Sequence, residues 1–468
     1  MTAIFQQGTV GDIGLAIKVM AEKIKEVARS HDLALQSKTG EIVRLQFEIP
    51  DVPLLTWLAA QRDSCKVYWS DREKEFEMAG VGVADLVMGN TWFDHDLLFS
   101  QVRSQISNNG KDVRYYGGLR FSHESVSRDD HPWKAFGCCR FVLPRFELYR
   151  HLDVTHFACN LIPRKDRDNL KAILDQLDAV TFFSRSTDQL MPSIKRRHDT
   201  PDQEGWKVMF NTAMQAIDQG ELEKIVLARR TTFEFSEDLK PILLLERLKT
   251  QSEGCVHFCV QVDSTTAFIG ASPERLYQRQ GRTIKSEAVA GTRPRGETYE
   301  ADERLGQELL SSEKDVTEHA YVVKSVDKIL SRLCRSHVNN GGNPAASLLK
   351  LTRVQHLISS FEGELADGIT DSEVLRSLHP TPSVGGYPAP QAITMIGKLE
   401  PFDRGWYAGP IGWIGFDDAE FMVGIRSGLI DGRTLHLFSG AGILNASTPQ
   451  REWEEIENKL SNFIEALC

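Results

Sequence analysis

The sequence lacks an excess of positive charge. Its 55 lysines and arginines are outnumbered by 65 aspartates and glutamates, which gives a formal net charge of −10. Proteins whose main partner is nucleic acid or an anionic membrane usually present a basic surface to it. We therefore expect neither nucleic acid nor a membrane as a partner, and any attraction of an anionic substrate has to come from local cations.

The sequence also lacks segments for export or membrane insertion. Its first residues, MTAIFQQGTVGDIG, contain no basic stretch followed by an apolar one, and no uninterrupted apolar run is long enough to cross a bilayer. The eight cysteines show no framework spacing, and Cys255, His257 and Cys259 alternate too regularly for a usual zinc site. These absences predict a cytoplasmic protein with reduced thiols.

Hydrophobic periodicity predicts an α/β (α+β) fold. Apolar residues recur at helical spacing over 14–30 and alternate with polar residues over 43–49. Because there is no GxGxxG loop and no βαβ alternation, we expect two stacked, largely antiparallel sheets flanked by helices. We divide the chain into a sheet-forming region over 1–200 and a catalytic region over 201–468, integrated into one structure, with a polar loop and linker zone over 163–204.

Two proton carriers of opposite polarity lie at the ends of apolar, strand-like runs. Lys224 precedes the apolar residues 225–227, and Glu274 follows the apolar run that begins at Phe268. A lysine acts as a base only when burial or a neighbouring cation lowers its pKa, and a glutamate acts as an acid only when apolar surroundings raise its pKa. The pair suggests acid/base chemistry, although alone it is more typical of a surface lysine and a glutamate in a Ser-Pro turn.

Two predicted helices carry further carboxylates. Glu318 lies on the same helical stripe as Val322 and Ile329, so it is expected to point inward, where it needs a partner. The C-terminal helix begins at Pro449 and carries a polar line composed of Glu452, Glu455 and Lys459. Alone, that line is more typical of a solvated face than of a site.

Two glycine-containing motifs near the C-terminus are predicted on consecutive strands. GIRS (424–427) and GAGI (440–443) accompany the β-rich stretches 421–425 and 434–438, which a turn at Asp431-Gly432 separates. The guanidinium of Arg426 can bind a carboxylate through two hydrogen bonds, and glycines let backbone N–H groups approach a ligand closely. Glycines can equally serve only to form turns.

Eight motifs occur in order along the chain. They are KIVLAR from Lys224, GASPE ending at Glu274, AGT at 290–292, SEKDVTEH at 312–319, HPTPSVGGYP at 379–388, GIRS, GAGI and EWEEIENKL at 452–460. Together they closely resemble the chorismate-utilising enzymes, the family that includes anthranilate synthase component I, and within it the isochorismate synthases of the menaquinone and siderophore type. The resemblance is dense from about residue 200 onward and thinner before it.

The resemblance implies a reaction and roles for individual residues. It implies magnesium-dependent conversion of chorismate to isochorismate, with Lys224 as the base that activates water for attack on ring C2 and Glu274 as the acid that protonates the departing C4 hydroxyl. It assigns magnesium, the one cofactor expected, to Glu318 and Glu455, whose hard oxygens suit that ion. The implied substrate-binding residues are Gly291, Thr292, His356, Arg426, Gly440 and Lys459.

The same resemblance implies that the nucleophile is water. Members that use ammonia carry glutamine or another residue in place of Lys224, and the aminodeoxychorismate makers carry a lysine directly before the Gly-Thr pair, where this chain has Ala290. We therefore expect no obligate glutaminase subunit, and a monomer or a homodimer.

Two alternatives remain open at the level of sequence. HPTPSVGGYP is similar to the isochorismate synthases, but Ser383 departs from the alanine that is common there. A salicylate synthase, which goes on to eliminate pyruvate, therefore stays as an alternative. The other is a catalytically silent binding homologue, against which the joint retention of four residues argues: Lys224, Glu274, Glu318 and Glu455.

Overall fold

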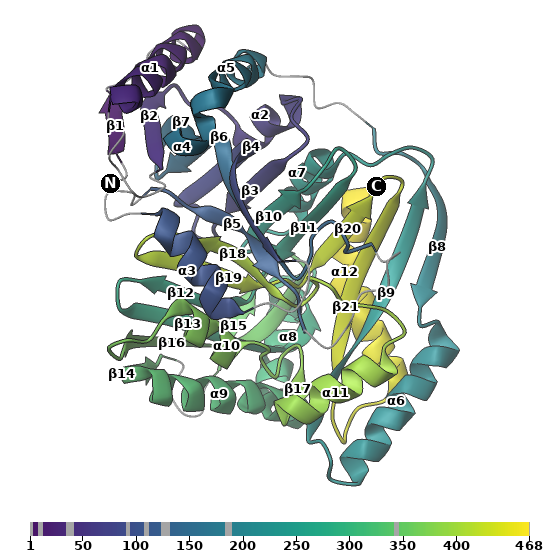
Figure 1. Cartoon of the computed structure of the whole chain (residues 1–468). Coiled ribbons are helices and arrows are strands. Elements are labelled where there is room, and N and C mark those ends of the chain that lie inside the picture. The colour runs from purple at the N-terminus through teal and green to yellow at the C-terminus, as the bar shows by residue number, and fades with distance from the viewer. Residues whose placement is uncertain are drawn as a thin grey trace.

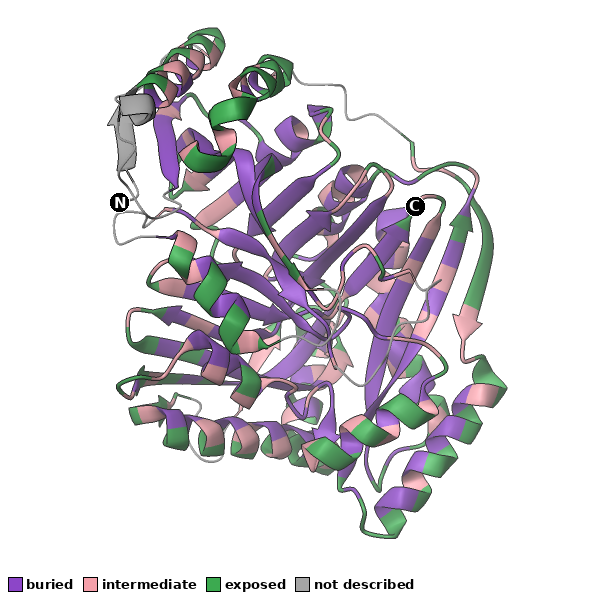
Figure 2. Ribbon diagram, in the orientation of Figure 1, coloured by how far each residue is buried: buried purple, intermediate pink, exposed green. Residues whose placement is uncertain are grey.

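The computed structural model of the chain describes residues 3–7, 13–33, 42–89, 94–106, 112–122, 132–182, 190–340 and 346–467. Within these ranges, no helix is both long enough and apolar enough to cross a membrane. Strands occupy the centre and helices lie mainly around them (Figure 1). Figure 2 shows the same division by burial: the central strands are largely buried, and the outward faces of the helices are exposed.

The described strands form one continuous hydrogen-bonded system with two branches. In order of pairing, the first branch consists of β1 (Ala3–Gln7), β2 (Val43–Ile49), β7 (Val154–Leu161), β6 (Cys139–His151), β4 (Phe76–Gly89), β3 (Lys66–Ser70), β10 (Val256–Gln261), β11 (Thr266–Ser272), β20 (Ser427–Asp431), β21 (Thr434–Ile443), β9 (Lys224–Phe235) and β8 (Ile194–Thr200). The short strand β17 (Gly386–Tyr387) pairs with the beginning of β9.

The second branch leaves the first at β6. Residues 139–142 of β6 pair with β5, whereas residues 146–151 pair with β7, so one strand borders both branches. The second branch consists of β5 (Tyr115–Leu119), β18 (Pro410–Ile414), β19 (Asp418–Val423), β12 (Arg275–Gln280), β13 (Thr283–Pro294) and β16 (Val354–Leu365), with β14 (Cys334–Asn339) and β15 (Ser347–Lys350) on the far edge of β16. The two predicted layers are thus joined through β6.

Pairing among the described strands is antiparallel, apart from the parallel pair β1–β2. The predicted fold class, α/β with largely antiparallel strands flanked by helices, is confirmed. The parallel pair corrects one expectation, because β1, α1 and β2 form a βαβ unit that the sequence pattern did not indicate. AIFQQ is short and does not alternate cleanly, so periodicity alone could not identify β1.

Two of the places where the chain crosses between the branches are hydrogen-bonded to each other. β11 leads into β12 through Pro273 and Glu274, and β19 leads into β20 through the segment that contains Arg426. The N–H of Ala271 donates to the carbonyl of Arg426 at 3.0 Å, and the N–H of Val423 donates to the carbonyl of Glu274 at 3.0 Å. Glu274 and Arg426 are therefore fixed at neighbouring crossings, where the branches meet.

The helices of the described residues are α1 (Ile13–Leu33), α2 (Leu54–Ala60), α3 (His95–Gln105), α4 (Pro163–Asp166), the 3-10 turn η1 (Arg167–Asn169), α5 (Leu170–Ala179), α6 (Gln203–Asp218), α7 (Pro241–Gln251), α8 (Tyr299–Ser311), α9 (Glu313–Leu333), α10 (Asp371–Leu378), α11 (Ala389–Leu399) and α12 (Pro449–Leu467). The zone over 163–204, expected to be loop and linker, instead contains α4, η1, α5 and β8. Its short apolar patches are sufficient for α5, because Ile173 and Leu177 lie one turn apart and are buried.

Two helices matter for the cavity between the branches. The Ser312 hydroxyl accepts the N–H of Asp315 and caps α9, which packs on β13 and β16 with Val322 and Val326 buried. α12 packs on β21 through an apolar stripe that includes Ile456 and Leu460. Both helices bury the apolar faces that the sequence predicts. Glu318 and Glu455 therefore lie on the side that faces the strands, where they line the cavity.

An aromatic cluster fills the space beside the crossings. The Phe136 ring lies 5.1 Å from Trp406 and the Trp133 ring 5.2 Å from Phe268, and Trp133 also contacts Phe438. Pairs of this kind contribute about 0.5–1.5 kcal/mol each beyond the burial of their area. The cluster joins β11 and β21 to the segment before β18, so it holds the two branches together next to the cavity.

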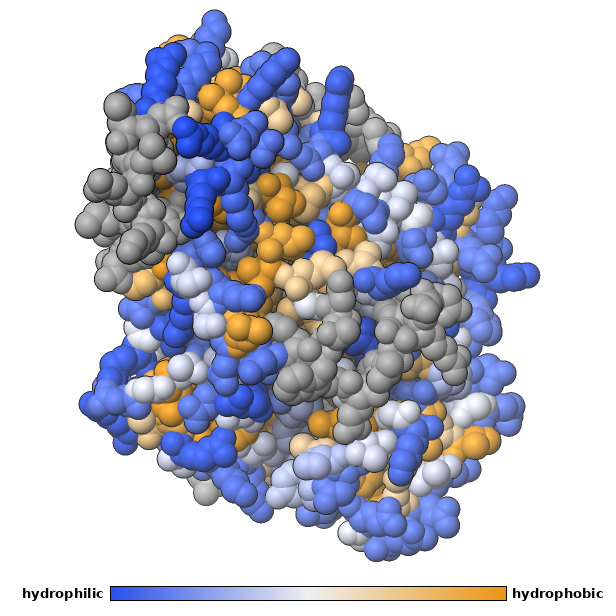
Figure 3. Space-filling view, in the orientation of Figure 1, coloured by the Kyte–Doolittle hydropathy of each residue, from blue (hydrophilic) through white to orange (hydrophobic). Residues whose placement is uncertain are grey.

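The surface seen in Figure 3 is mainly hydrophilic, with apolar side chains gathered in smaller groups. This agrees with the acidic composition, in which charged residues make up 26% of the chain.

Candidate active site

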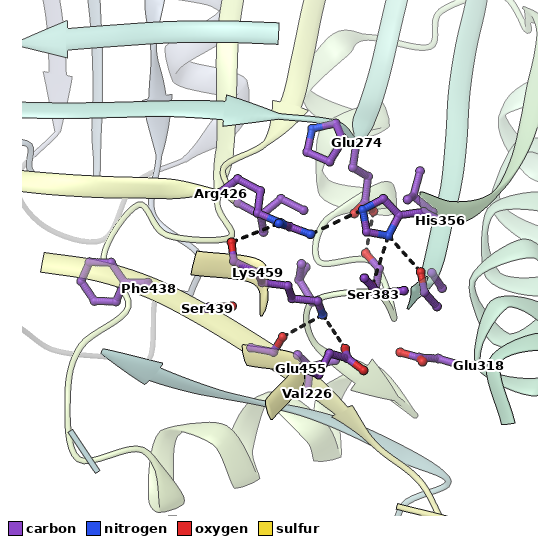
Figure 4. Close-up of a pocket in the computed structure, with 18 of the residues that line it drawn as sticks. Val226, Glu274, Glu318, His356, Ser383, Arg426, Phe438, Ser439, Glu455 and Lys459 are labelled. Atoms are coloured by element: carbon purple, nitrogen blue, oxygen red, sulfur yellow. Dashed lines mark hydrogen bonds and ion pairs between the residues drawn. The ribbon is translucent and has the colours of Figure 1, made fainter. Parts of the chain in front are cut away.

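A cavity lies between the two branches, next to both crossings (Figure 4). β9 and β21 of the first branch supply one wall, and β13 and β16 of the second branch supply another. The helices α9 and α12 and the loop before β17 complete it. Its polar and charged lining residues are Glu274, Thr292, Glu318, His356, Ser383, Tyr407, Arg426, Ser439, Glu455 and Lys459.

Lys224 is the first residue of β9, and its side chain is fully buried. Its Nζ lies 3.1 Å from Glu318 Oε1 across the gap to α9, although it makes no hydrogen bond of good geometry within the described residues. It does not itself line the cavity, but Glu318 and Val226 on either side of it do. The lysine is therefore one contact away from the cavity.

Gly442 of β21 leaves the room that this contact requires. A Cβ atom at this position would lie 2.3 Å from Glu318 Oε1 and 3.1 Å from Lys224 Cε. Both approaches are closer than ordinary van der Waals contact, so glycine is needed here for close approach and not for a turn.

Glu274 follows β11 and is 2% exposed. The Ser383 hydroxyl donates to its Oε1 at 2.5 Å, and Thr381 lies 3.4 Å from the same oxygen. Burial raises the pKa of Glu274 to about 7, an effect that the Ser383 hydrogen bond and the charge of Lys224 partly offset. A carboxyl group with such a pKa can carry a proton at neutral pH and release it, which is what a general acid requires.

Cationic groups also line the cavity: Arg426 lies in the crossing beside Glu274, and Lys459 lies on α12. The Arg426 guanidinium donates to the Lys459 carbonyl at 3.0 Å and lies 3.4 Å from His356 Nε2. Arg426 has φ = +50°, an uncommon conformation for a residue with a side chain, and it lies in the crossing rather than in a strand. Lys459 Nζ donates to the carbonyl of Gly440 at 3.0 Å and lies 2.7 Å from Glu455 Oε1.

His356 is neutral in this environment. Burial, together with the nearby Arg426 charge, lowers its pKa to about 3. Its Nδ1 lies 2.9 Å from the carbonyl of Gly291, which accepts a hydrogen bond, so Nδ1 carries the proton and Nε2 is left as an acceptor that faces Arg426. Gly291, which has φ = +69°, and Thr292 beside it line the cavity from β13.

The carboxylates of α9 and α12 could hold a cation. Glu318 and Glu455 both line the cavity, and the charge of Lys459 lowers the pKa of Glu455 against the opposing effect of burial. Glu452, one turn before Glu455, is fully buried, with Oε1 paired to Lys314 and Oε2 left without a hydrogen-bond partner among the described residues. Within the described chain no cluster of three such ligands forms. The two carboxylates that line the cavity nevertheless fit a hard divalent cation whose remaining ligands are water or substrate.

The structure brings the predicted residues together. Nine of them line the cavity: Glu274, Gly291, Thr292, Glu318, His356, Arg426, Gly440, Glu455 and Lys459; the tenth, Lys224, contacts Glu318 behind the lining. One structural detail was wrong. GIRS and GAGI do not lie on consecutive strands, because the predicted strand over 421–425 ends at Val423, Arg426 lies in a crossing, and β20 intervenes.

Several lining residues were not singled out by sequence reasoning. Tyr407, Ser439 and Phe438 line the cavity, and Thr381 contacts Glu274. The available signals were weak: Tyr407 lies in RGWYAGP, a glycine-rich stretch next to a β-rich run, and Ser439 directly precedes GAGI.

Comparison with known proteins identifies related sequences and structures. A family model described as chorismate binding enzyme matches residues 25–468. The chain is 31% identical over 448 residues to the isochorismate synthase MenF of Haemophilus influenzae, covering 95% of this chain and 96% of that relative. It is 34% identical over 414 residues to a chloroplastic isochorismate synthase of Catharanthus roseus, covering 85% of this chain and 69% of that relative.

A solved structure shares the fold. The structure of MenF, the menaquinone-specific isochorismate synthase of Escherichia coli, superposes with a TM-score of 0.81 at 26% sequence identity, and the match covers 95% of this chain and all of that one. The similarity therefore extends over the N-terminal residues, where the motifs are sparse.

Proposed function

Since the chain belongs to the family of chorismate-binding enzymes, we propose that it converts chorismate to isochorismate. Water adds at ring C2, the ring double bonds shift, and the C4 hydroxyl leaves as water, so the product is an isomer of the substrate. The observation that carries the proposal is a carboxyl group with a raised pKa in a cavity that cationic side chains also line, with a buried lysine in contact with a lining carboxylate.

Lys224 and Glu274 perform the two proton transfers. Lys224, acting as the free amine, takes a proton from the attacking water, and Glu274, acting in its protonated form, gives one to the departing hydroxyl. The raised pKa of Glu274 supports the acid role, because the group holds its proton up to about pH 7. The contact of Lys224 with Glu318 ties the base to the proposed metal-binding carboxylate.

The cationic wall binds the two carboxylates of the substrate. Arg426 can form two parallel hydrogen bonds to a carboxylate, and Lys459 adds a point charge beside it. Neutral His356, Gly291, Thr292 and Gly440 supply shape and hydrogen bonds without further charge. The local positive charge of Arg426 and Lys459 explains how a protein with a net charge of −10 attracts a dianion.

Magnesium is the cofactor that we propose for Glu318 and Glu455. When bound there, it would neutralise the charge of these carboxylates and of a substrate carboxylate. Without it, the two carboxylates would repel a dianionic ligand in the same cavity. Lys224, and Ala290 in place of the lysine that the aminodeoxychorismate makers carry, support water as the nucleophile and a protein without a glutaminase partner.

We further propose a cytoplasmic enzyme that acts as a monomer or homodimer and has neither nucleic acid nor a membrane as a partner. The cysteines whose side chains are described are free thiols, most of them buried, which suits a reducing compartment.

The test is a product analysis of the purified protein with chorismate and magnesium, resolved by chromatography. We expect isochorismate and no pyruvate, and a loss of roughly two to four orders of magnitude in rate for Lys224→Ala. Lys207→Ala, an exposed lysine of α6, is the matched control and should keep the wild-type rate. Pyruvate release would identify a salicylate synthase, and unchanged chorismate would identify a silent homologue.

A further inference from the structure

Ser383 is the hydroxyl closest to the carboxyl group of Glu274. Its Oγ lies 2.5 Å from Glu274 Oε1 and 2.5 Å from Thr381 Oγ1, whereas Thr381 Oγ1 itself lies 3.4 Å from Glu274 Oε1. Each hydroxyl has a single hydrogen. The short distances therefore favour a relay in which Thr381 donates to Ser383 and Ser383 donates to Oε1, and hydrogen bonds linked in this way strengthen each other.

The loop that carries Ser383 is fixed between the acid and the base. The N–H groups of Val384 and Gly385 donate to the Thr381 carbonyl at 3.2 and 3.0 Å and close a turn around Ser383. The Val226 N–H donates to the Gly385 carbonyl at 2.9 Å, and Tyr387 pairs with Lys224 in the β17–β9 ladder. A hydroxyl on this loop therefore has a defined position relative to both proton carriers.

We propose that Ser383 is a positioning residue for the general acid: its hydroxyl holds Glu274 Oε1 as a hydrogen-bond acceptor and so leaves the transferable proton on Oε2. A protonated carboxyl group has one hydroxyl oxygen and one carbonyl oxygen. Because Oε1 already receives a donor, the proton belongs on the other oxygen. The role of Ser383 in catalysis rests on the proposed function, but the placement of the proton on Oε2 does not.

The same hydrogen bond stabilises the carboxylate form, so Ser383 also sets the pH at which the acid loses its proton. Other charges face Glu274 from the surrounding elements. Lys224 of β9 favours the carboxylate, and Glu287 of β13 opposes it. The same cavity is lined by Glu318 of α9, His356 of β16, Arg426 of the neighbouring crossing, and Glu455 and Lys459 of α12. Removing the Ser383 hydroxyl leaves these charges in place, which isolates its contribution.

The variant that tests the proposal is Ser383→Ala, with Ser383→Thr as the conservative rescue. For Ser383→Ala we expect the basic limb of the kcat profile to move up by roughly one pH unit, the size of one hydrogen bond to a charged group. We expect kcat below that limb to fall by roughly tenfold, part of what a positioned acid contributes, with KM nearly unchanged. Ser383→Thr should restore both. Ser377→Ala, a serine of α10 bonded to Arg332, should change neither.

A second readout needs no turnover. Infrared titration of the free protein should show a protonated carboxyl band that disappears in Glu274→Gln. In Ser383→Ala this band should move to higher frequency, because its carbonyl oxygen loses a donor, and its midpoint should rise. An unchanged band and midpoint in Ser383→Ala would overturn the proposal, even if the wild-type protein makes isochorismate. A wild-type protein that makes none while the band moves would overturn the proposed function and leave the placement of the proton standing.

Discussion

Glu274, the proposed acid, combines a role in catalysis with an effect on stability. The group is buried, and burial raises its pKa to about 7 from an ordinary value of 4.5. The folded protein therefore holds a proton that the unfolded chain has already released between these two pH values. The stability that this protonated group contributes is fully present below pH 4.5 and is lost as the pH rises through 7.

Replacing this carboxyl group should separate the two effects. Glu274→Gln should lower turnover by roughly two to four orders of magnitude. Above pH 7 the wild-type protein carries a buried charge at this position, and the variant carries none. The difference in the free energy of unfolding, variant minus wild type, should therefore be larger above pH 7 than at pH 4, by up to about 3 kcal/mol. Denaturant unfolding at the two pH values measures the second effect. If Glu274→Gln were inactive and less stable than the wild type at pH 8, the assignment of Glu274 as the buried acid would be contradicted.

The pH dependence of the wild-type enzyme follows from the same group. Because the acid must carry its proton, activity should be present below about pH 7 and fall as the pH rises through it. The pH profile of kcat/KM for chorismate measures this limb. If the limb persists unchanged in a slow Glu274→Gln variant, another group sets it.

Arg426 is the cation that we expect to contribute most to substrate recognition. Its strained backbone and its bond to the Lys459 carbonyl aim the guanidinium into the cavity. Arg426→Ala should lower kcat/KM by the equivalent of roughly 2–5 kcal/mol, as for other truncated buried charge pairs. Arg433→Ala removes an exposed arginine of the β20–β21 turn and should have no such effect. An unchanged specificity constant in Arg426→Ala would make this arginine structural.

Among the elements, regular periodicity was predictable and the crossings were not. α9 and α12 follow from helical stripes and β9 from an apolar run, and each was recognised in the sequence. Arg426 lies outside the strand predicted for it because its left-handed backbone depends on hydrogen bonds between the two crossings. Nothing local in GIRS encodes those bonds. The Ser383 contact with Glu274 joins residues 109 positions apart, so only the assembled loop reveals it.

Gly442 gives a prediction about β21 as an element. Gly442→Ala should displace Glu318 or Lys224, since the new Cβ would lie 2.3 Å from a Glu318 oxygen. We expect activity to fall by roughly two orders of magnitude while the fold persists. Gly397→Ala is the matched control, because its Cβ meets nothing within 4 Å and lies in α11, where alanine is favoured. Circular dichroism checks that both variants are folded. Equal activities of the two variants would contradict the close approach of Gly442 to Glu318.

For the whole molecule, the cavity exists because two branches of one sheet system diverge from β6 and meet again at the crossings. Sequence reasoning reached the layered, antiparallel class and, through the ordered motifs, the residues that the cavity gathers. It could not reach the junction at β6, because pairing partners far apart in the chain are not visible in local patterns. The division at residue 200 stays a prediction, and strands from both sides of it pair in each branch.

Metal removal tests how these parts work together. Two carboxylates from separate helices face a cavity for a dianion, so activity should disappear with EDTA and return with magnesium. Glu318→Gln and Glu455→Gln should each lose most turnover and bind magnesium more weakly in calorimetric titration. Glu454→Gln, an exposed neighbour on α12, should behave like wild type. Full activity in EDTA would rule out the metal assignment.

The proposed reaction requires that water attack C2 and that the C4 hydroxyl depart within this cavity. The most direct measurement is the reaction of purified protein with chorismate and magnesium in ¹⁸O-labelled water, followed by mass spectrometry of the product. We expect isochorismate that carries one solvent oxygen and is formed without pyruvate, and we expect Lys224→Ala to lose this product. Isochorismate without solvent oxygen, or labelled product formed at the wild-type rate by Lys224→Ala, would contradict the proposed reaction.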